Sequence, residues 1–302
     1  MNVLTVLIPI FGVFAIGYIG FKLLKFEIKS ISTMALYLMS PFLAFRTFYE
    51  NEINIDYFYL GASLLLLCGL SIFICYVIGA IGKWNKQERS SFILASSFMN
   101  NGNYGTPLVL LVFGEAGFHY AVILMVLQQL IMCTIGIYIA AYGGASNARG
   151  QKHSPLKEVL MMPIVYGALL GVVFNLANFN IGAQLMTAVS MVADAAIPTI
   201  MIVLGMQLAT IKLKKLEKGR LSLALLLRLV GGPIIAYLIT VPLPLDDMIR
   251  NIIILMAAMP TAANTTMYAL QFDTKPDFVS SATLTSTLLS VVTIPIILAL
   301  LL

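Results

Sequence analysis

Two apolar stretches of the chain contain the residues that could bind a ligand. Residues 99–107 read MNNGNYGTP and residues 259–264 read MPTAAN. Asparagine, glycine and proline are poor helix formers, and non-helical backbone inside a membrane is tolerated only within protein or beside a cavity. The N-termini of interrupted helices and asparagine amides both offer donors to an anion. The sequence therefore predicts a substrate site with these candidate residues: Asn100, Asn101, Gly102, Asn103, Gly105, Pro260, Thr261 and Asn264.

Other polar residues in apolar runs have two interpretations each. Asp194 lies four residues before Pro198. It could couple protons or touch the substrate, as intramembrane acids often do, or it could be a structural acid that caps backbone freed by the proline. Gln128 and Gln129 could reach the substrate site or form ordinary hydrogen bonds between helices. The hydroxyls of residues 280–293 could coordinate sodium or pack helices closely, and packing is favoured.

The sequence shows no sign of an enzyme. There is no Ser/His/Asp, Cys/His or paired-carboxylate arrangement on a plausible common face, and no phosphate-binding loop. The three cysteines, Cys68, Cys75 and Cys133, lie in apolar runs, where a thiol is usually a small packing residue. We therefore expect no metal and no cofactor, with coupling to Na⁺ or H⁺ left open.

The elements that must position these residues are membrane-spanning helices. Only 10% of the 302 residues are charged, 60% are hydrophobic and the mean hydropathy is +0.96, whereas a soluble domain has about 25% charged residues. Uninterrupted apolar runs indicate helices and not barrel strands. We predict an all-α polytopic membrane protein with ten spans, at residues 3–24, 31–50, 57–82, 90–113, 117–142, 157–178, 183–210, 220–241, 247–270 and 278–302.

The basic residues predict how the spans face. Most of the 18 Lys and Arg lie in the loops after odd-numbered spans, and the even-numbered loops hold only Arg250. The positive-inside rule places the odd loops in the cytoplasm and both termini outside. The net charge of +5 therefore reflects topology, and no basic patch suggests a nucleic-acid partner.

The two halves of the chain look like copies of one unit. Pro9 and Pro163 are 154 residues apart, Pro41 and Pro198 are 157 apart, and Asn103 falls on Asn264 at a shift of 161. A duplicated unit with five spans must be inverted in its second copy, as in many secondary transporters. We predict a first repeat at 1–142, a cytoplasmic linker at 143–156 and an inverted repeat at 157–302.

The motifs resemble those of one family over the whole chain. The Asn100–Pro107 segment is similar to the N-x-G-x-x-G-x-P stretch of span four in the auxin efflux carrier family, which includes plant auxin exporters and bacterial carriers assigned to malate or malonate. Residues 260–264 are similar to its P-T-A-x-N segment in span nine. The resemblance implies the crossing-helix fold of bile-acid/sodium symporters and sodium/proton antiporters. It also implies an elevator mechanism, a dimerising scaffold of spans 1, 2, 6 and 7, a transport domain of spans 3–5 and 8–10, and substrate contact by Asn100.

We therefore expect a secondary transporter of a small organic anion in the cell membrane. The substrate would be a carboxylate, either a dicarboxylate or an auxin-like aromatic acid, and the other partners would be lipids and a second copy of the chain. The alternatives are a sodium- or proton-coupled symporter or antiporter of the same fold and, more remotely, a non-transporting membrane receptor.

Overall fold

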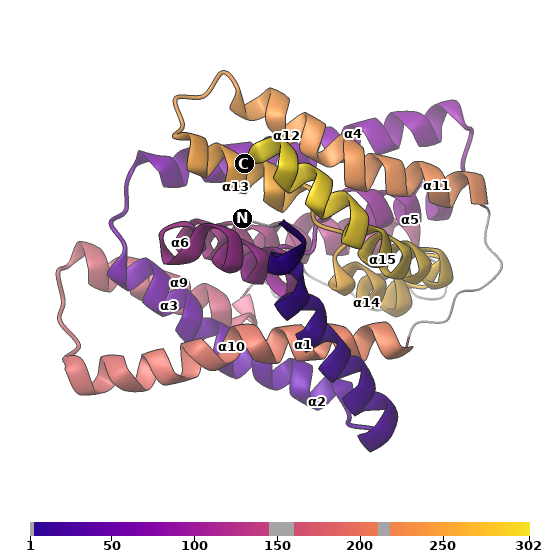
Figure 1. Cartoon of the computed structure of the whole chain (residues 1–302). Coiled ribbons are helices and arrows are strands. Elements are labelled where there is room, and N and C mark those ends of the chain that lie inside the picture. The colour runs from indigo at the N-terminus through magenta and orange to yellow at the C-terminus, as the bar shows by residue number, and fades with distance from the viewer. Residues whose placement is uncertain (1–2, 145–159, 211–217) are drawn as a thin grey trace.

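The computed structural model describes residues 3–144, 160–210 and 218–302. Within these ranges the protein is helical and has no strand, only one isolated β-bridge (Figure 1). The predicted linker falls outside the described residues from position 145 onward, and so do the basic residues at 149, 152, 157, 212, 214 and 215. The prediction of an all-helical protein is confirmed for the part of the chain that can be seen.

Most predicted spans correspond to helices. The helices are α1 (Val3–Leu24), α2 (Ile28–Thr33), α3 (Ser40–Glu50), α4 (Ile55–Ile81), α5 (Lys86–Ser96), α6 (Thr106–Ile131), α7 (Ile137–Gly143), α9 (Pro163–Leu176), α10 (Ala183–Thr210), α11 (Lys218–Leu226), α12 (Gly232–Thr240), α13 (Asp247–Ala257), α14 (Ala263–Phe272) and α15 (Pro276–Leu301). Short π-helical segments join some of them: η1 (Met34–Met39), η2 (Asn101–Gly105), η3 (Met132–Gly136) and η5 (Leu227–Gly231).

Six of the continuous helical stretches are long and apolar enough to cross a membrane. They are Ile28–Glu50, Ile55–Ile81, Asn101–Gly143, Ala183–Thr210, Lys218–Thr240 and Pro276–Leu301. Two of the predicted spans, 90–113 and 247–270, are instead broken in the middle. The longest stretch also contains a turn, because Gly114 has φ +65° and ψ −163°, which is not helical. This turn separates the predicted spans 90–113 and 117–142.

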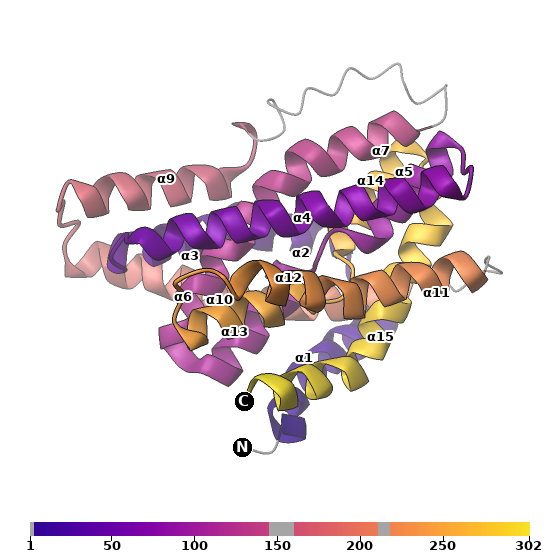
Figure 2. The same ribbon diagram turned by 90° about the horizontal axis from the view of Figure 1, so that it is seen from above.

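Four helical stretches pack together on one side of the molecule. The α1 helix packs on α10, α3 packs on α9, and α10 also contacts α3 (lower half of Figure 1). The remaining helices form the other part, in which α4 packs on α5, α6 and α12, and α13 lies against α12 and α6 (Figure 2).

The contacts on the first side are backbone to backbone. A Cβ atom added to Gly17 of α1 would lie 2.1 Å from the Ile202 carbonyl oxygen of α10. In the same way, a Cβ on Gly171 of α9 would lie 2.6 Å from the Phe45 carbonyl oxygen of α3. Small residues permit this close approach, which drives helix association in lipid by van der Waals packing.

An ionic cluster ties three elements together at the end of the molecule where α5 begins. Asn85 and Glu88 form a capping box at the N-terminus of α5. The Glu88 carboxylate also accepts bonds from Arg220 at 2.7 Å and from Lys275 at 3.0 Å, which come from α11 and from the connection before α15. Hydrogen bonds from these two cations and from the Asn85 backbone lower the pKa of Glu88 to about 2, against the opposing effect of burial.

We expect Glu88→Gln to destabilise the protein by about 1–3 kcal/mol at neutral pH, because charge-assisted bonds of a half-buried carboxylate are lost. The pKa of Glu88 in the folded protein lies below its value of about 4.3 in the unfolded chain. The ionised carboxylate therefore stabilises the fold fully above about pH 4.3, and this stabilisation disappears as the pH falls toward 2. Thermal unfolding of both proteins in detergent from pH 7 to pH 3 measures this. Glu52→Gln, at an exposed position, is the control. A constant difference across this pH range would contradict the prediction.

Candidate functional site

The two predicted interruptions meet at the centre of the molecule. The α5 helix ends at Ser96 and α13 ends at Ala257. Beyond these ends the two backbone segments lie side by side and pair through an antiparallel bridge between Met99 and Thr261. The Asn100 N–H donates to the Pro260 carbonyl at 2.9 Å, and the Ala262 N–H donates to the Phe98 carbonyl at 3.0 Å.

We call this arrangement the crossover: residues 97–105 and 258–262 with the ends of α5, α6, α13 and α14 that flank them. The bridge relates positions 162 apart, because Met99 faces Thr261, whereas the sequence alignment of Asn103 with Asn264 used a shift of 161. Proline suits position 260 because its carbonyl accepts the bond from Asn100 and its missing N–H is not required there.

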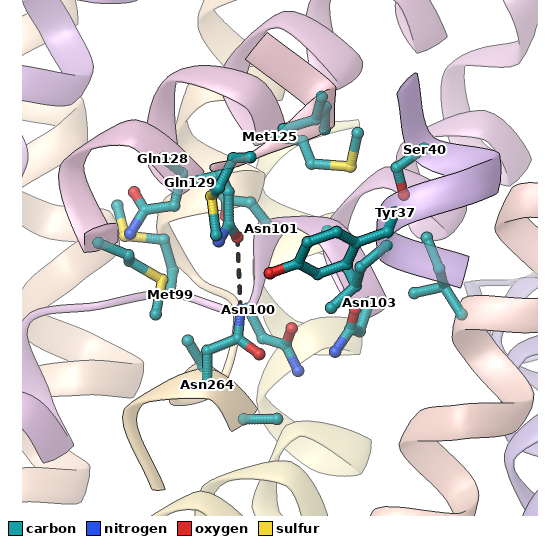
Figure 3. A pocket seen from close by; sticks show the side chains of 18 of the residues that line it. Tyr37, Ser40, Met99, Asn100, Asn101, Asn103, Met125, Gln128, Gln129 and Asn264 are labelled. Atoms are coloured by element: carbon teal, nitrogen blue, oxygen red, sulfur yellow. Dashed lines mark hydrogen bonds between the residues drawn. The ribbon is translucent and has the colours of Figure 1, made fainter. Parts of the chain in front are cut away.

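A cavity that is partly open to solvent lies beside the crossover (Figure 3). It is lined by seven of the candidate residues from the sequence analysis: Asn100, Asn101, Gly102, Asn103, Gln128, Gln129 and Asn264. These come from separate elements, namely η2 and its flank, α6 and α14. The crossing of the broken helices brings them together.

Three of the selected residues near the crossover do not line this cavity. Thr261 is fully buried and bonded on both sides, with its N–H donating to Ser286 Oγ at 3.0 Å and its Oγ1 donating to the Ala95 carbonyl at 2.6 Å. Gly105 lies against α13, where an added Cβ would be 2.6 Å from Met256 Sδ. Together with Pro260, these residues hold the crossover in shape and do not face the cavity.

Buried amide groups are the main polar feature of the cavity. The Nδ2 atoms of Asn100 and Asn101 and the Nε2 atom of Gln128 have no hydrogen-bond partner among the described residues, and the same is true of Asn101 Oδ1. Only one side-chain bond joins the selected amides here, from Asn264 Nδ2 to Gln129 Oε1 at 3.3 Å (dashed line in Figure 3). An unpartnered buried polar group costs about 1–3 kcal/mol. Three such donors are therefore suited to a ligand with acceptor oxygens.

Most of the remaining wall is apolar. Four methionines line it, with Leu36, Pro163, Ile164 and Ile200; the methionines are Met99, Met125, Met132 and Met162. Thioethers are polarisable and adapt to apolar and aromatic surfaces. No Lys, Arg, His, Asp or Glu is among the described residues of the lining. Positive potential comes instead from the N-terminus of α14, which begins at Ala263 on the cavity wall.

Part of this wall was not foreseen from the sequence. Tyr37 of η1 points into the cavity toward Asn100, and Ser40 lies nearby at the start of α3 (Figure 3). Residues 162–164 come from the start of α9, and Ile200 comes from α10. These positions lie in ordinary apolar helices and carry no local signal, so only the packing of the two parts of the molecule reveals them.

Asp194 lies away from the cavity. Its carboxylate pairs with Arg46 of α3 at 2.7 Å, and its side chain is 68% exposed on the surface of α10. Four hydroxyls of α15 bond within their own helix. Those of Thr283, Ser286, Thr287 and Ser290 all bond to carbonyls of their own helix.

We expect Asp194→Asn to leave ligand affinity within about twofold of the parent, because the carboxylate does not reach the cavity. The pH profile of transport should also be unchanged, while the folded yield falls through loss of the pair with Arg46. Arg46→Gln removes the same pair and should give the same result. A flattened pH profile with normal binding in Asp194→Asn alone would instead assign proton coupling to this acid.

Comparison with known proteins is consistent over the full length of the chain. The model of a family described as Membrane transport protein matches residues 2–298. An "Uncharacterized transporter" of Methanothermobacter thermautotrophicus is 26% identical over 281 residues, covering 89% of this chain and 88% of that protein. A second "Uncharacterized transporter", from Methanocaldococcus jannaschii, is 23% identical and covers 92% of each chain. A "Putative malonate transporter" of Rhizobium meliloti is 24% identical over 304 residues, covering 95% of this chain and 92% of that protein.

Proposed function

Because the chain belongs to the Membrane transport protein family, which confirms its resemblance to the auxin efflux carriers, we propose that it carries a small organic anion through the crossover cavity. The observation that carries this proposal is the set of unpartnered amide donors on Asn100, Asn101 and Gln128. A carboxylate has two oxygens with about four acceptor sites, so it can accept from more than one amide donor. Each charge-assisted bond would contribute about 1.5–3 kcal/mol.

The lining favours an anion with one carboxylate and an apolar body. The amides can receive one carboxylate, and the methionine and aliphatic wall suits a ring or alkyl group. A dicarboxylate would place its second charge against this wall without a basic side chain to meet it, and burying an unpaired charge is costly. The relative named for malonate keeps the dicarboxylate in the test.

Uptake of a labelled carboxylate into liposomes containing the purified protein tests the proposal. We expect arylacetates such as phenylacetate to inhibit this uptake at concentrations at least tenfold lower than malonate or malate do. A neutral arylacetamide should not inhibit it. Uptake that requires an imposed Na⁺ or H⁺ gradient would favour the coupled carrier. Absence of binding and uptake for every carboxylate would refute an organic-anion carrier.

We also propose that the two halves are inverted repeats. Gly17 meets Ile202, and Gly171 meets Phe45. The repeat shifts of 154 and 157 turn the first contact into the second, since 17 becomes 171 and 45 becomes 202. Each repeat would contribute five crossings, one of them interrupted, which makes ten in all.

An elevator mechanism fits the position of the cavity. One wall of the cavity belongs to the part of the molecule formed by η1, α3, α9 and α10, through Tyr37, Ser40, Pro163 and Ile200. The amides belong to the other part. We assign the first part, α1–α3 with α9 and α10, as the scaffold, and the second part as the transport domain. Sliding of the second part against the first would carry the amide cluster across the membrane with its ligand.

The same scaffold would form a homodimer. The pair between Arg46 and Asp194 lies at the surface of α3 and α10, with Asp194 largely exposed. Ionic groups facing lipid are unfavourable, and a second copy would cover them. An apolar groove lined by Phe42, Phe45 and Leu185 adjoins the pair on the same helices.

We place both termini outside the cell membrane. A single cysteine introduced at Lys83, in a background without native cysteines, should react with an impermeant reagent only from the cytoplasm. A cysteine at Asp247 should react only from outside, since both positions are exposed and lie at or just before the starts of equivalent half-helices. Labelling of both positions from one side would refute this topology.

A further inference from the structure

Arg228 is a fully buried cation next to the crossover. It lies in η5, between α11 and α12, and its exposed fraction is 0%. Its Nη1 donates to the Ser96 carbonyl at 3.2 Å and lies 3.8 Å from Met99 Sδ, and its Nη2 donates to the Ala257 carbonyl. No ion pair joins Arg228 to an acid among the residues that the structure describes.

The two carbonyls that bind Arg228 lie at the C-terminal ends of two half-helices. Ser96 is the last residue of α5, and Ala257 is the last residue of α13. Each helix C-terminus carries about half a negative charge on carbonyls without a partner in the helix. The two half-helices therefore bring about one negative charge to the crossover, close to a cavity whose amides are suited to an anion. One guanidinium group balances this charge.

We propose that Arg228 is a built-in cation of the crossover: it holds the C-termini of both half-helices and takes the place that a bound metal cation would otherwise fill. Its positive charge cancels the negative helix ends, and the positive N-terminus of α14 then dominates the potential in the cavity. The crossover is thereby selective for anions, and Na⁺ is not required to assemble it. The statement about anions rests on the proposed function, whereas the statement about assembly does not.

The local backbone is fitted to this guanidinium. A Cβ atom on Gly232 would lie 2.3 Å from Arg228 Nη2 and 2.7 Å from the Ala257 carbonyl oxygen. At the adjacent Gly231 the nearest atom to an added Cβ is Leu227 Cδ2 at 3.6 Å, which is ordinary contact. Glycine at 232 thus leaves room for the bond between the arginine and the end of α13. The two glycines form a matched pair for displacing the arginine without removing it.

The first experiment uses the protein without substrate. Thermal unfolding of the purified parent protein should be the same in NaCl and in choline chloride. Arg228→Ala should unfold at a lower temperature in choline chloride, and millimolar guanidinium or Na⁺ should raise that temperature by several degrees, because a cation can enter the vacated place. Stabilisation of the parent by Na⁺ would overturn the proposal, and so would an Arg228→Ala protein that neither cation stabilises.

The second experiment measures carboxylate affinity. Arg228→Lys should stay within about tenfold of the parent, and Arg228→Met, which has similar bulk and no charge, should bind more than tenfold more weakly. Gly232→Ala should also weaken binding about tenfold, while Gly231→Ala should bind as the parent does. This glycine pair decides the matter if Arg228→Met does not fold. Parent-like binding by Arg228→Met or Gly232→Ala would overturn the anion statement. If the parent itself binds no carboxylate, the proposed function fails, and the cation experiment still tests the assembly.

Discussion

Replacing Asn100 with alanine should weaken carboxylate binding about ten- to a hundredfold. The side chain lies on the cavity wall, and its Nδ2 has no partner among the described residues, so its bond is free for a ligand. A charge-assisted bond contributes about 1.5–3 kcal/mol, and 1.4 kcal/mol is a factor of ten. Asn100→Asp should bind more weakly still, because it sets a negative charge against the anion. Isothermal titration with an arylacetate measures both.

The folded yield should change little, since the backbone of residue 100 makes the structural bonds at the crossover. Its N–H donates to Pro260, and its carbonyl accepts from Gly105 at 3.0 Å. Asn251→Ala is the control, because this asparagine bonds to the Leu301 carbonyl and does not line the cavity. Parent affinity in Asn100→Asp would rule out an anion at this position, and loss of folded protein in both Asn100 variants would assign the residue a structural role.

Gly17→Ala and Gly171→Ala should each destabilise the protein by about 3 kcal/mol or more. The new methyl group would meet a backbone carbonyl oxygen at 2.1 Å or 2.6 Å, and main chain within a helix cannot move aside as a flexible side chain does. Overpacking usually costs about 1–3 kcal/mol even where side chains can adjust. The fraction of monodisperse protein and its unfolding temperature measure the effect.

The α1 helix, which contains Gly17, also provides the controls. An added Cβ on Gly12 or Gly20 meets no atom within 4 Å. Alanine there should be neutral or slightly stabilising, because it lowers the entropy cost of ordering the helix. If the proposed repeats are equivalent, Gly17→Ala and Gly171→Ala should be similarly harmful. Harm from only one of them would show that the two contacts are not equivalent.

Several parts of the fold could be predicted because their signals are local. The run from Ala183 to Thr210 is continuous and apolar, and its predicted bounds are those of α10. The breaks within 90–113 and 247–270 followed from asparagine, glycine and proline in apolar runs. Asn100, Asn101 and Asn264 lie in these breaks and their amides offer donors to an anion, and the structure places all three on one cavity.

Other features depend on contacts between distant segments. Gly105, Pro260 and Thr261 belong to the same motifs as the cavity residues, and only the register of the bridge decides which of them face inward. Tyr37 looks like any aromatic residue of an apolar helix until η1 is packed against the crossover. The sequence places Arg228 inside a span, but its role depends on where α5 and α13 end.

The bridge between Met99 and Thr261 is made by main-chain atoms alone. Any residue other than proline can supply the N–H groups at positions 100 and 262, so the two backbone bonds do not depend on the side chains of these two residues. These two side chains, unlike those of Thr261 and Arg228, are therefore free to change over evolutionary time while the architecture persists. A lineage could acquire a new cargo by altering amides and thioethers around a joint that tolerates their replacement.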